Sequence, residues 1–158
     1  MLRSVYIETT IVSYLVARPS RDAIMAERQR QTREWWENRR GRFELFTSEL
    51  VCREVARGER EMARARTAML AGIPIFLVDP QVAALAAALL RKGPLPTRAE
   101  TDAHHIALAA VHGLDYLVTW NCKHIANPRL YQKITNVCRE RGFEPPVLCT
   151  PEELQGGG

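Results

Sequence analysis

The sequence VYIETTIVSYL, residues 5–15, interrupts an apolar stretch with a glutamate and two threonines. Residues 5–7 form a short continuous apolar run, which is typical of a buried strand in a parallel sheet. Glu8 follows directly, and apolar residues resume at Ile11. A carboxylate at the end of a core strand is costly unless a cation or hydrogen bonds compensate for its charge. Glu8 is therefore the first candidate functional residue.

Length and composition favour a single soluble domain. The chain has 158 residues, of which 46% are hydrophobic and 25% are charged, as is usual for a globular protein with one core. No apolar stretch approaches the roughly 20 residues that span a bilayer, and the N-terminus lacks the apolar region of a signal peptide. We expect a cytoplasmic protein without a membrane segment, with one domain over residues 1–150 and a C-terminal tail over 151–158.

Residue spacing disfavours several other chemistries. The four cysteines contain no CxxC pair, so we expect free thiols rather than disulfides or a zinc site. His104 and His105 are adjacent, so they point about 100° apart on a helix and cannot readily share one ion. A surface position is favoured for His105, although it could reach a substrate phosphate. The chain has no Gly-rich phosphate loop and no GxSxG motif, which excludes P-loop nucleotide hydrolysis and serine hydrolysis.

The hydrophobic pattern predicts strands that alternate with helices. We expect strands over residues 4–8, 43–47, 73–79, 115–119 and 146–149. We expect helices over residues 10–17, 22–40, 49–57, 59–71, 81–93, 97–113 and 128–141, with a capping box formed by Thr97 and Glu100. This alternation favours a mostly parallel sheet with helices on both faces. In such sheets, binding sites form at the carboxyl ends of the strands.

Three further polar residues stand close to that edge of the predicted sheet. Glu54 falls inside the apolar stripe of its helix, Asp102 flanks the apolar stripe of another helix, and Asn121 follows the strand 115–119. Each residue also has a structural explanation. Glu54 could extend its carboxylate to solvent, Asp102 could interact with the helix dipole, and Asn121 could cap a turn.

Taken together, the acids favour a metal site. Glu8, Glu54 and Asp102 would offer the hard oxygen ligands that suit Mg²⁺ or Mn²⁺, and a cation would compensate for the charge of Glu8. Clustered carboxylates that hold such a metal are typical of phosphoryl chemistry. We predict these three residues as metal ligands and, with Asn121, as the catalytic residues.

The chain has a net charge of +4 and a pI of about 9.1. Its positive charge is unevenly distributed, with a concentration in an arginine-rich segment. Six arginines lie between residues 28 and 42, interleaved with Trp35 and Trp36. Such a segment could follow a phosphate backbone and offer a stacking surface. It could equally be a solvated helix, with tryptophans that pack on the core or on a dimer partner. We favour the second interpretation for the tryptophans, and both stay open for the arginines. Arg30, Arg33 and Arg40 are the candidate contacts to a nucleic-acid backbone.

The sequence resembles the PIN-domain nucleases, in particular the VapC-like toxins of toxin–antitoxin pairs. The resemblance covers nearly the whole chain, through the segments YIETTIVSYL, TSELVCREVARGE and TDAHHIALAAVHGLDYLVTWNCKHI. It implies a three-layer α/β/α sandwich and a ribonuclease that depends on Mg²⁺ or Mn²⁺. It also implies RNA as the substrate, a small antitoxin protein as a partner, and a homodimer.

The motifs of that family fall on the acids already singled out. Glu8 takes the place of the usual aspartate in the first motif, Glu54 and Asp102 match the second and third, and Asn121 matches the fourth. Glu8 departs from the family pattern because it is one methylene longer than aspartate, a difference that could move the metal or loosen its geometry.

The same motifs suggest further residues near the substrate. Thr9 belongs to the first motif, and Thr119 and His124 belong to the fourth. Trp120 occupies a position that is usually small or polar, and it could stack on a base or only fill space. Two alternatives to a ribonuclease stay open: a PIN-like RNA-binding or regulatory module with little or no catalysis, and a nuclease that acts on DNA.

Overall fold

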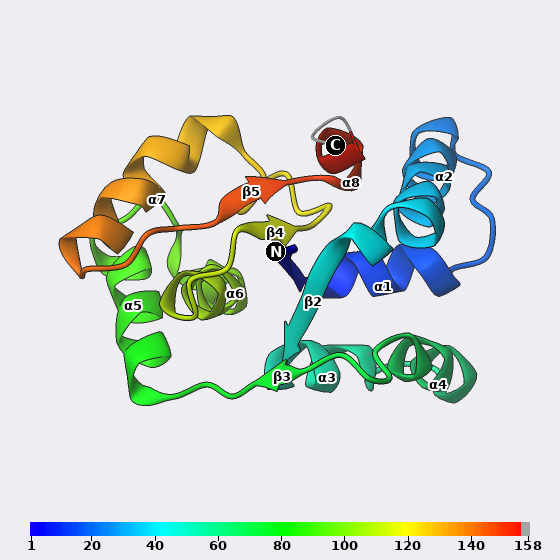
Figure 1. Cartoon of the computed structure of the whole chain (residues 1–158), viewed down its shortest axis with the longest axis horizontal. Helices are drawn as coiled ribbons and strands as arrows, with labels where there is room; N and C mark the ends of the chain where they lie inside the picture. Colours follow the sequence, from blue (N-terminus) through cyan, green and yellow to red (C-terminus); the bar gives the residue numbers. More distant parts are fainter. Residues whose placement is uncertain (156–158) are drawn as a thin grey trace.

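Five parallel strands form the centre of the molecule, in the order β3-β2-β1-β4-β5 (Figure 1). The computed structural model describes residues 1–155, so the final three glycines of the expected tail lie outside the described residues. The strands are β1 (Arg3–Ile7), β2 (Phe43–Ser48), β3 (Ile75–Phe76), β4 (Tyr116–Val118) and β5 (Val147–Cys149).

Helices cover both faces of this sheet. On one side α5 packs against α6 and α7, and on the other α1 packs against α2, α3 and α4, while α2 also contacts α8 (Figure 1). This arrangement confirms the expected three-layer α/β/α sandwich. The helices are α1 (Thr9–Val16), α2 (Ala23–Asn38), α3 (Glu49–Val55), α4 (Arg60–Met69), α5 (Pro80–Arg91), α6 (Glu100–Val111), α7 (Pro128–Glu140) and α8 (Pro151–Gln155), with 3-10 turns η1 (Arg40–Arg42) and η2 (Thr97–Ala99).

The centre of β1 and the tryptophans of α2 lie in the core. Val5, Tyr6 and Ile7 of β1 are fully buried, as expected for the middle strand of a sheet that is covered on both faces. Trp35 is also fully buried, Trp36 nearly so, and the Trp35 ring lies 5.8 Å from the ring of Phe43. The favoured interpretation of the tryptophans, that they pack on the core, is therefore confirmed.

The strand expected over residues 73–79 is shorter than its sequence pattern indicates. Only Ile75 and Phe76 pair with β2, opposite Thr47 and Ser48. The chain of β2 turns away at this point, because Ser48 caps the N-terminus of α3. Residues 77 and 78 therefore have no neighbouring strand to pair with.

The expected capping box of Thr97 and Glu100 is not formed. Residues 97–99 make a 3-10 turn, α6 begins at Glu100, and no side chain caps this helix. The turn is closed by a hydrogen bond from the backbone N–H of Ala99 to the carbonyl of Pro96, at 2.8 Å. This local bond moves the start of the helix three residues beyond Thr97.

Residues 151–155, which were expected to belong to a tail, form the short helix α8 against α2. Leu154 of this helix is buried and belongs to the hydrophobic core. Within residues 1–155, no helix combines the length and the apolar composition that crossing a bilayer requires.

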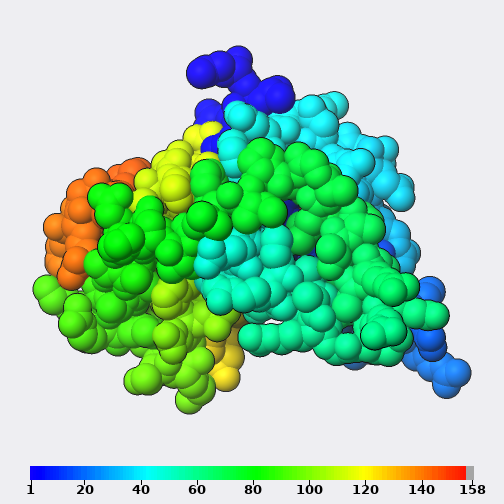
Figure 2. Space-filling model, turned by 90° about the horizontal axis from the view of Figure 1, so that it is seen from below, coloured from blue at the N-terminus to red at the C-terminus, as the bar shows by residue number. Residues whose placement is uncertain are grey.

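Figure 2 shows the face built from α3, α4 and the segment around β3. Ile75 and Leu77 of this segment are exposed.

Candidate active site

The order in which successive strands are added to the sheet reverses between β1 and β4. From β1 the chain proceeds through β2 to β3 on one side, and it then returns to place β4 and β5 on the other side. At such a switch point the connections leave the carboxyl ends of two neighbouring strands in opposite directions and open a crevice. Glu8 follows β1 at this point, and Thr119 and Asn121 follow β4.

Glu8 is held by the protein on one of its two carboxylate oxygens. The side chain caps the N-terminus of α1 and is only 4% exposed. Its Oε1 accepts hydrogen bonds from the Thr10 backbone N–H at 3.0 Å, from the Thr10 hydroxyl, and from the Thr119 hydroxyl at 2.7 Å. These bonds and the positive end of the α1 dipole compensate for part of the cost of burying the charge.

Glu54 approaches the same edge from α3. Its Oε1 accepts hydrogen bonds from the Thr9 hydroxyl at 2.7 Å and from Nε2 of His105 at 2.8 Å. Partial burial opposes ionisation of this carboxyl, but the hydrogen bond and charge of His105, with smaller effects of Thr9 and Arg57, outweigh it and lower the pKa of Glu54. Glu54 is therefore a carboxylate at neutral pH.

His105 is buried, so the surface position favoured for it was wrong. Its side chain is 1% exposed, and its Nδ1 lies 2.6 Å from the Tyr6 hydroxyl. Burial disfavours the charged imidazole, but the hydrogen bond that His105 donates to Glu54 and the charges of Glu8, Glu54 and Asp102 outweigh it and raise the pKa of His105. All three acids therefore lie close enough to influence one imidazole.

A signal for this burial was present in the sequence. Residues 105–110 are all buried in α6, and apart from His105 this run contains only apolar side chains. A helix that is apolar around most of its circumference is typical of a core position. The tight packing of α6 against α5 places the imidazole inside.

Asp102, His124 and Asn121 are joined by hydrogen bonds. Nδ1 of His124 lies 2.9 Å from Oδ2 of Asp102, and the backbone N–H of His124 donates to Oδ1 of Asn121 at 3.0 Å. The Asn121 side chain thus caps the turn after β4, which is the structural role considered for it from the sequence. Its amide nitrogen makes no hydrogen bond with the residues that the structure describes.

The three acids share one feature. Each carboxylate receives its protein hydrogen bonds on a single oxygen, which leaves Oε2 of Glu8, Oε2 of Glu54 and Oδ1 of Asp102 without a partner among residues 1–155. Free carboxylate oxygens are the ligands that Mg²⁺ and Mn²⁺ prefer. As the side chains stand, however, no three Asp, Glu, His or Cys residues in the described part of the chain are grouped closely enough to hold an ion.

The two threonines expected near the substrate donate hydrogen bonds to the acids. Thr119 is fully buried and donates its hydroxyl to Glu8, so it lies behind the carboxylate rather than on the surface. Thr9 is half-buried and donates its hydroxyl to Glu54. Both residues fix the positions of carboxylates.

The candidate RNA contacts on the arginine-rich segment do not all lie near the acids. Arg40 precedes β2, at the end of the sheet where the strands begin, and its guanidinium stacks 4.4 Å from the Trp36 ring. The acids lie at the opposite end of the strands. Arg30 is exposed on α2 and is paired with Glu27 at 2.6 Å; Arg33 lies on the same helix.

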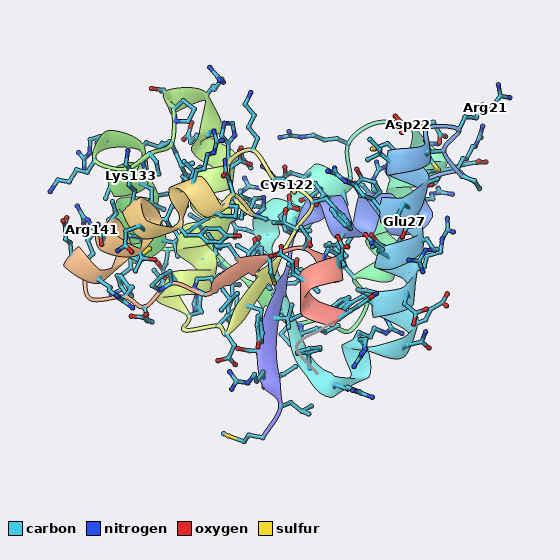
Figure 3. All side chains as sticks on the ribbon, turned by 90° about the horizontal axis from the view of Figure 1, so that it is seen from above. Arg21, Asp22, Glu27, Cys122, Lys133 and Arg141 are labelled. Atoms are coloured by element: carbon cyan, nitrogen blue, oxygen red, sulfur yellow. The ribbon has the colours of Figure 1, made fainter. Side chains whose placement is uncertain are left out.

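Arg28, which the sequence analysis did not select, reaches the loop after β4. Its guanidinium lies 5.0 Å from the centre of the Trp120 ring. The Trp120 side chain is only 7% exposed, and its indole N–H donates to the Thr32 hydroxyl at 2.7 Å, so it mainly fills space. A groove of about 550 Å³ separates α2 from this loop; Figure 3 labels Glu27 on the helix and Cys122 on the loop.

Solved structures with a similar fold include these three. The chain resembles VapC20 of Mycobacterium tuberculosis, described as a toxin that cleaves the sarcin–ricin loop, with a TM-score of 0.59, 16% identity, and coverage of 90% of this chain and 99% of that one. A toxin–antitoxin complex from Klebsiella pneumoniae matches with a TM-score of 0.55, 21% identity, and coverage of 78% and 92%. VapBC2 of Rickettsia felis, bound to a fragment of promoter DNA, matches with a TM-score of 0.50, 17% identity, and coverage of 80% and 95%.

These likenesses concern the fold, since all three identities are low. The comparison with curated proteins finds no match. The family model of the PIN domain matches residues 5–121, a range that contains β1 to β4, the three acids and Asn121. The chain therefore belongs to the PIN domain family.

Proposed function

We propose that the protein is a metal-dependent endoribonuclease and the toxin of a toxin–antitoxin pair. Glu8, Glu54 and Asp102 would hold Mg²⁺ or Mn²⁺, and Asn121 would orient a water molecule or a phosphate oxygen. The observation that carries the proposal is the free oxygen on each of three carboxylates, of which Glu8 follows β1 and Glu54 and Asp102 stand on α3 and α6.

The donor set fits a hard divalent cation, because it consists of carboxylate oxygens. Mutual repulsion keeps free carboxylates apart, so binding would draw the three side chains together. When bound, a divalent cation supplies stabilisation for the charge that develops on a phosphodiester during hydrolysis.

The remaining residues of the site would bind and orient the RNA. The unpaired amide nitrogen of Asn121 can donate a hydrogen bond. Arg28 and Arg57 lie near the acidic edge, since Arg28 contacts Trp120 and Arg57 influences the pKa of Glu54. Both could contact phosphate groups that flank the scissile bond. Contacts of Arg30, Arg33 or Arg40 would require an RNA that extends along α2.

The related structures support the toxin assignment. The mycobacterial protein with a similar fold is described as a toxin that cleaves the sarcin–ricin loop, and the structure from Klebsiella pneumoniae is a toxin–antitoxin complex. We expect this protein to be restrained by a small antitoxin that places a cationic side chain among the three acids. We also expect a homodimer, which light scattering of the purified protein tests.

One observation favours a binding module as the second candidate. Glu8 caps α1 and is hydrogen-bonded by two threonines, so its position has a structural reason that requires no metal. In this case the protein would bind RNA without cleaving it.

Cleavage of labelled single-stranded RNA by the purified protein separates these candidates. The ribonuclease proposal predicts cleavage that requires Mg²⁺ or Mn²⁺, stops when EDTA is added, and is lost in Asp102→Asn. Binding without cleavage would support the module, and cleavage of single-stranded DNA in preference to RNA would support a DNA nuclease.

Expression in a bacterial host tests the toxin assignment separately. Wild type should arrest growth, and Asp102→Asn should not. Coexpression of a cognate antitoxin should restore growth. A wild-type protein that cleaves RNA in vitro but leaves growth unaffected would instead indicate an RNA-processing enzyme.

A further inference from the structure

A line of buried hydrogen bonds crosses the sheet and ends at Glu54. The backbone N–H of Val51 donates to Oγ of Ser48 at 3.3 Å, and this oxygen lies 2.7 Å from the Tyr6 hydroxyl. The Tyr6 hydroxyl lies 2.6 Å from Nδ1 of His105, and Nε2 of His105 lies 2.8 Å from Oε1 of Glu54. The line thus connects β2, β1, α6 and α3.

The acceptor at its end determines the direction of the bond between His105 and Glu54. Glu54 is ionised and can only accept, so Nε2 of His105 carries a hydrogen in both the neutral and the charged imidazole. In the neutral form, Nδ1 accepts from Tyr6, Tyr6 accepts from Ser48, and Ser48 accepts from Val51. Burial raises the pKa of Tyr6 well above its usual value, so its hydroxyl keeps its proton for this purpose.

We propose that His105 is a positioning residue for Glu54: anchored by Tyr6 and Ser48, it binds one carboxylate oxygen and leaves the other directed to a divalent cation. This inference rests on the proposed function, because it concerns the same metal site.

The geometry explains why Glu54 needs such support. It stands on a helix of only 7 residues and its side chain is 27% exposed, so its rotamers are not restricted by packing alone. Thr9 donates to the same oxygen as His105, and the two donors together leave Oε2 free. Groups that hold a metal ligand in this way typically change metal affinity by about 10- to 100-fold when they are removed.

A matched pair of substitutions tests which nitrogen matters. The amide nitrogen of Gln can replace Nε2 of His105 and donate to Glu54, whereas the amide of Asn reaches only the position of Nδ1. We expect His105→Asn to weaken Mn²⁺ binding by about 10- to 100-fold in calorimetry without RNA. His105→Gln should restore affinity toward that of wild type.

Two further variants serve as controls. His104→Asn changes the neighbouring half-buried histidine, whose ring hydrogen-bonds to the carbonyl of Glu100 and to none of the three acids in the described residues, and it should bind Mn²⁺ like wild type. Glu54→Gln removes the charge of the ligand itself. If Glu54→Gln binds Mn²⁺ and cleaves RNA as well as wild type, the proposed function fails at this site, whatever His105 does.

Other results would contradict the positioning role of His105 without contradicting the proposed function. The positioning role is overturned if Glu54→Gln loses Mn²⁺ binding while His105→Asn retains it, or if the Asn and Gln variants are equally impaired, since a merely structural histidine would not distinguish the two nitrogens. Circular dichroism and melting temperatures establish that the variants fold. If His105→Asn does not fold, Tyr6→Phe provides a second test. This variant removes only the hydroxyl group that anchors the imidazole. Weaker Mn²⁺ binding by Tyr6→Phe then supports the proposal, and unchanged binding overturns it.

Discussion

His124 and Asp102 join the loop after β4 to the first turn of α6, through a contact of 2.9 Å between Nδ1 and Oδ2. A second histidine, His105, joins α6 to Glu54 on α3 at 2.8 Å. Two of the three candidate metal ligands are therefore each held by an imidazole from another element. Replacing one of these carboxylates by the matching amide removes its charge but keeps its shape, because the amide oxygen accepts the same hydrogen bonds. The contribution of the charge can therefore be measured separately.

The first prediction concerns Asp102→Asn. The amide oxygen can still accept from His124, so the fold should remain, but the charge that binds a cation is lost. We expect RNA cleavage to fall by about 10³-fold, equivalent to about 4 kcal/mol of transition-state stabilisation. The melting temperature without metal should be unchanged or higher, because repulsion among the acids decreases. Cleavage at the wild-type rate would remove Asp102 from the site.

The second prediction compares two substitutions of Glu8. In Glu8→Gln the amide oxygen can keep the bonds from Thr10 and Thr119, so the protein should melt as wild type while its Mn²⁺ affinity falls at least about tenfold. In Glu8→Asp the shorter side chain cannot reach both threonines, and the buried Thr119 hydroxyl loses its acceptor.

The expected cost of Glu8→Asp is about 1–3 kcal/mol, which lowers the melting temperature by several degrees in a chain of this size. Calorimetry with Mn²⁺ and thermal unfolding measure the two effects. If Glu8→Gln binds Mn²⁺ as tightly as wild type, Glu8 is only a cap of α1.

The third prediction concerns pH and the pair of Glu54 and His105. The lowered pKa of Glu54 contributes stability above its unfolded value, near pH 4.3, and this contribution is lost as the pH falls. The raised pKa of His105 contributes stability below its unfolded value, near pH 6.5, and this contribution is lost as the pH rises through the folded pKa. The pair therefore stabilises the fold most between these two values.

Thermal unfolding without metal, at several pH values, measures this effect. The stability of wild type should decline above about pH 6.5, by at most about 1.4 kcal/mol per pH unit from this one group. His105→Gln has no ionisable group at this position, so its decline should be smaller, while the other histidines contribute equally to both proteins. Parallel curves for the two proteins would show that folding does not shift the pKa of His105.

The fourth prediction compares Arg28, which contacts Trp120 after β4, with Arg40, which precedes β2. Arg28→Ala should weaken RNA binding and reduce the salt dependence by about 0.7 of a unit of slope for one lost phosphate contact. Arg40→Ala should have little effect on a short RNA, since Arg40 lies at the far end of the strands. Fluorescence anisotropy over a range of salt concentrations provides the measurement. A larger effect of Arg40 would place the RNA along α2.

The sequence by itself determined the sheet architecture and the positions of the acids along the chain. Alternation of strands and helices follows from local hydrophobic periodicity, and parallel strands bring their carboxyl ends to one edge. The positions of Glu8 and Asn121 at the carboxyl ends of two strands were therefore predictable, as was the unusual place of Glu54 on its helix.

Only the tertiary structure decided which groups these acids contact. The burial of His105, its bonds to Tyr6 and Glu54, and the contact of Arg28 with Trp120 all depend on elements far apart in the sequence. The two-residue length of β3 has the same origin, because pairing ends where β2 turns into α3. Local propensity describes a residue and its near neighbours along the chain, whereas hydrogen-bond partners and burial depend on the elements that pack against it.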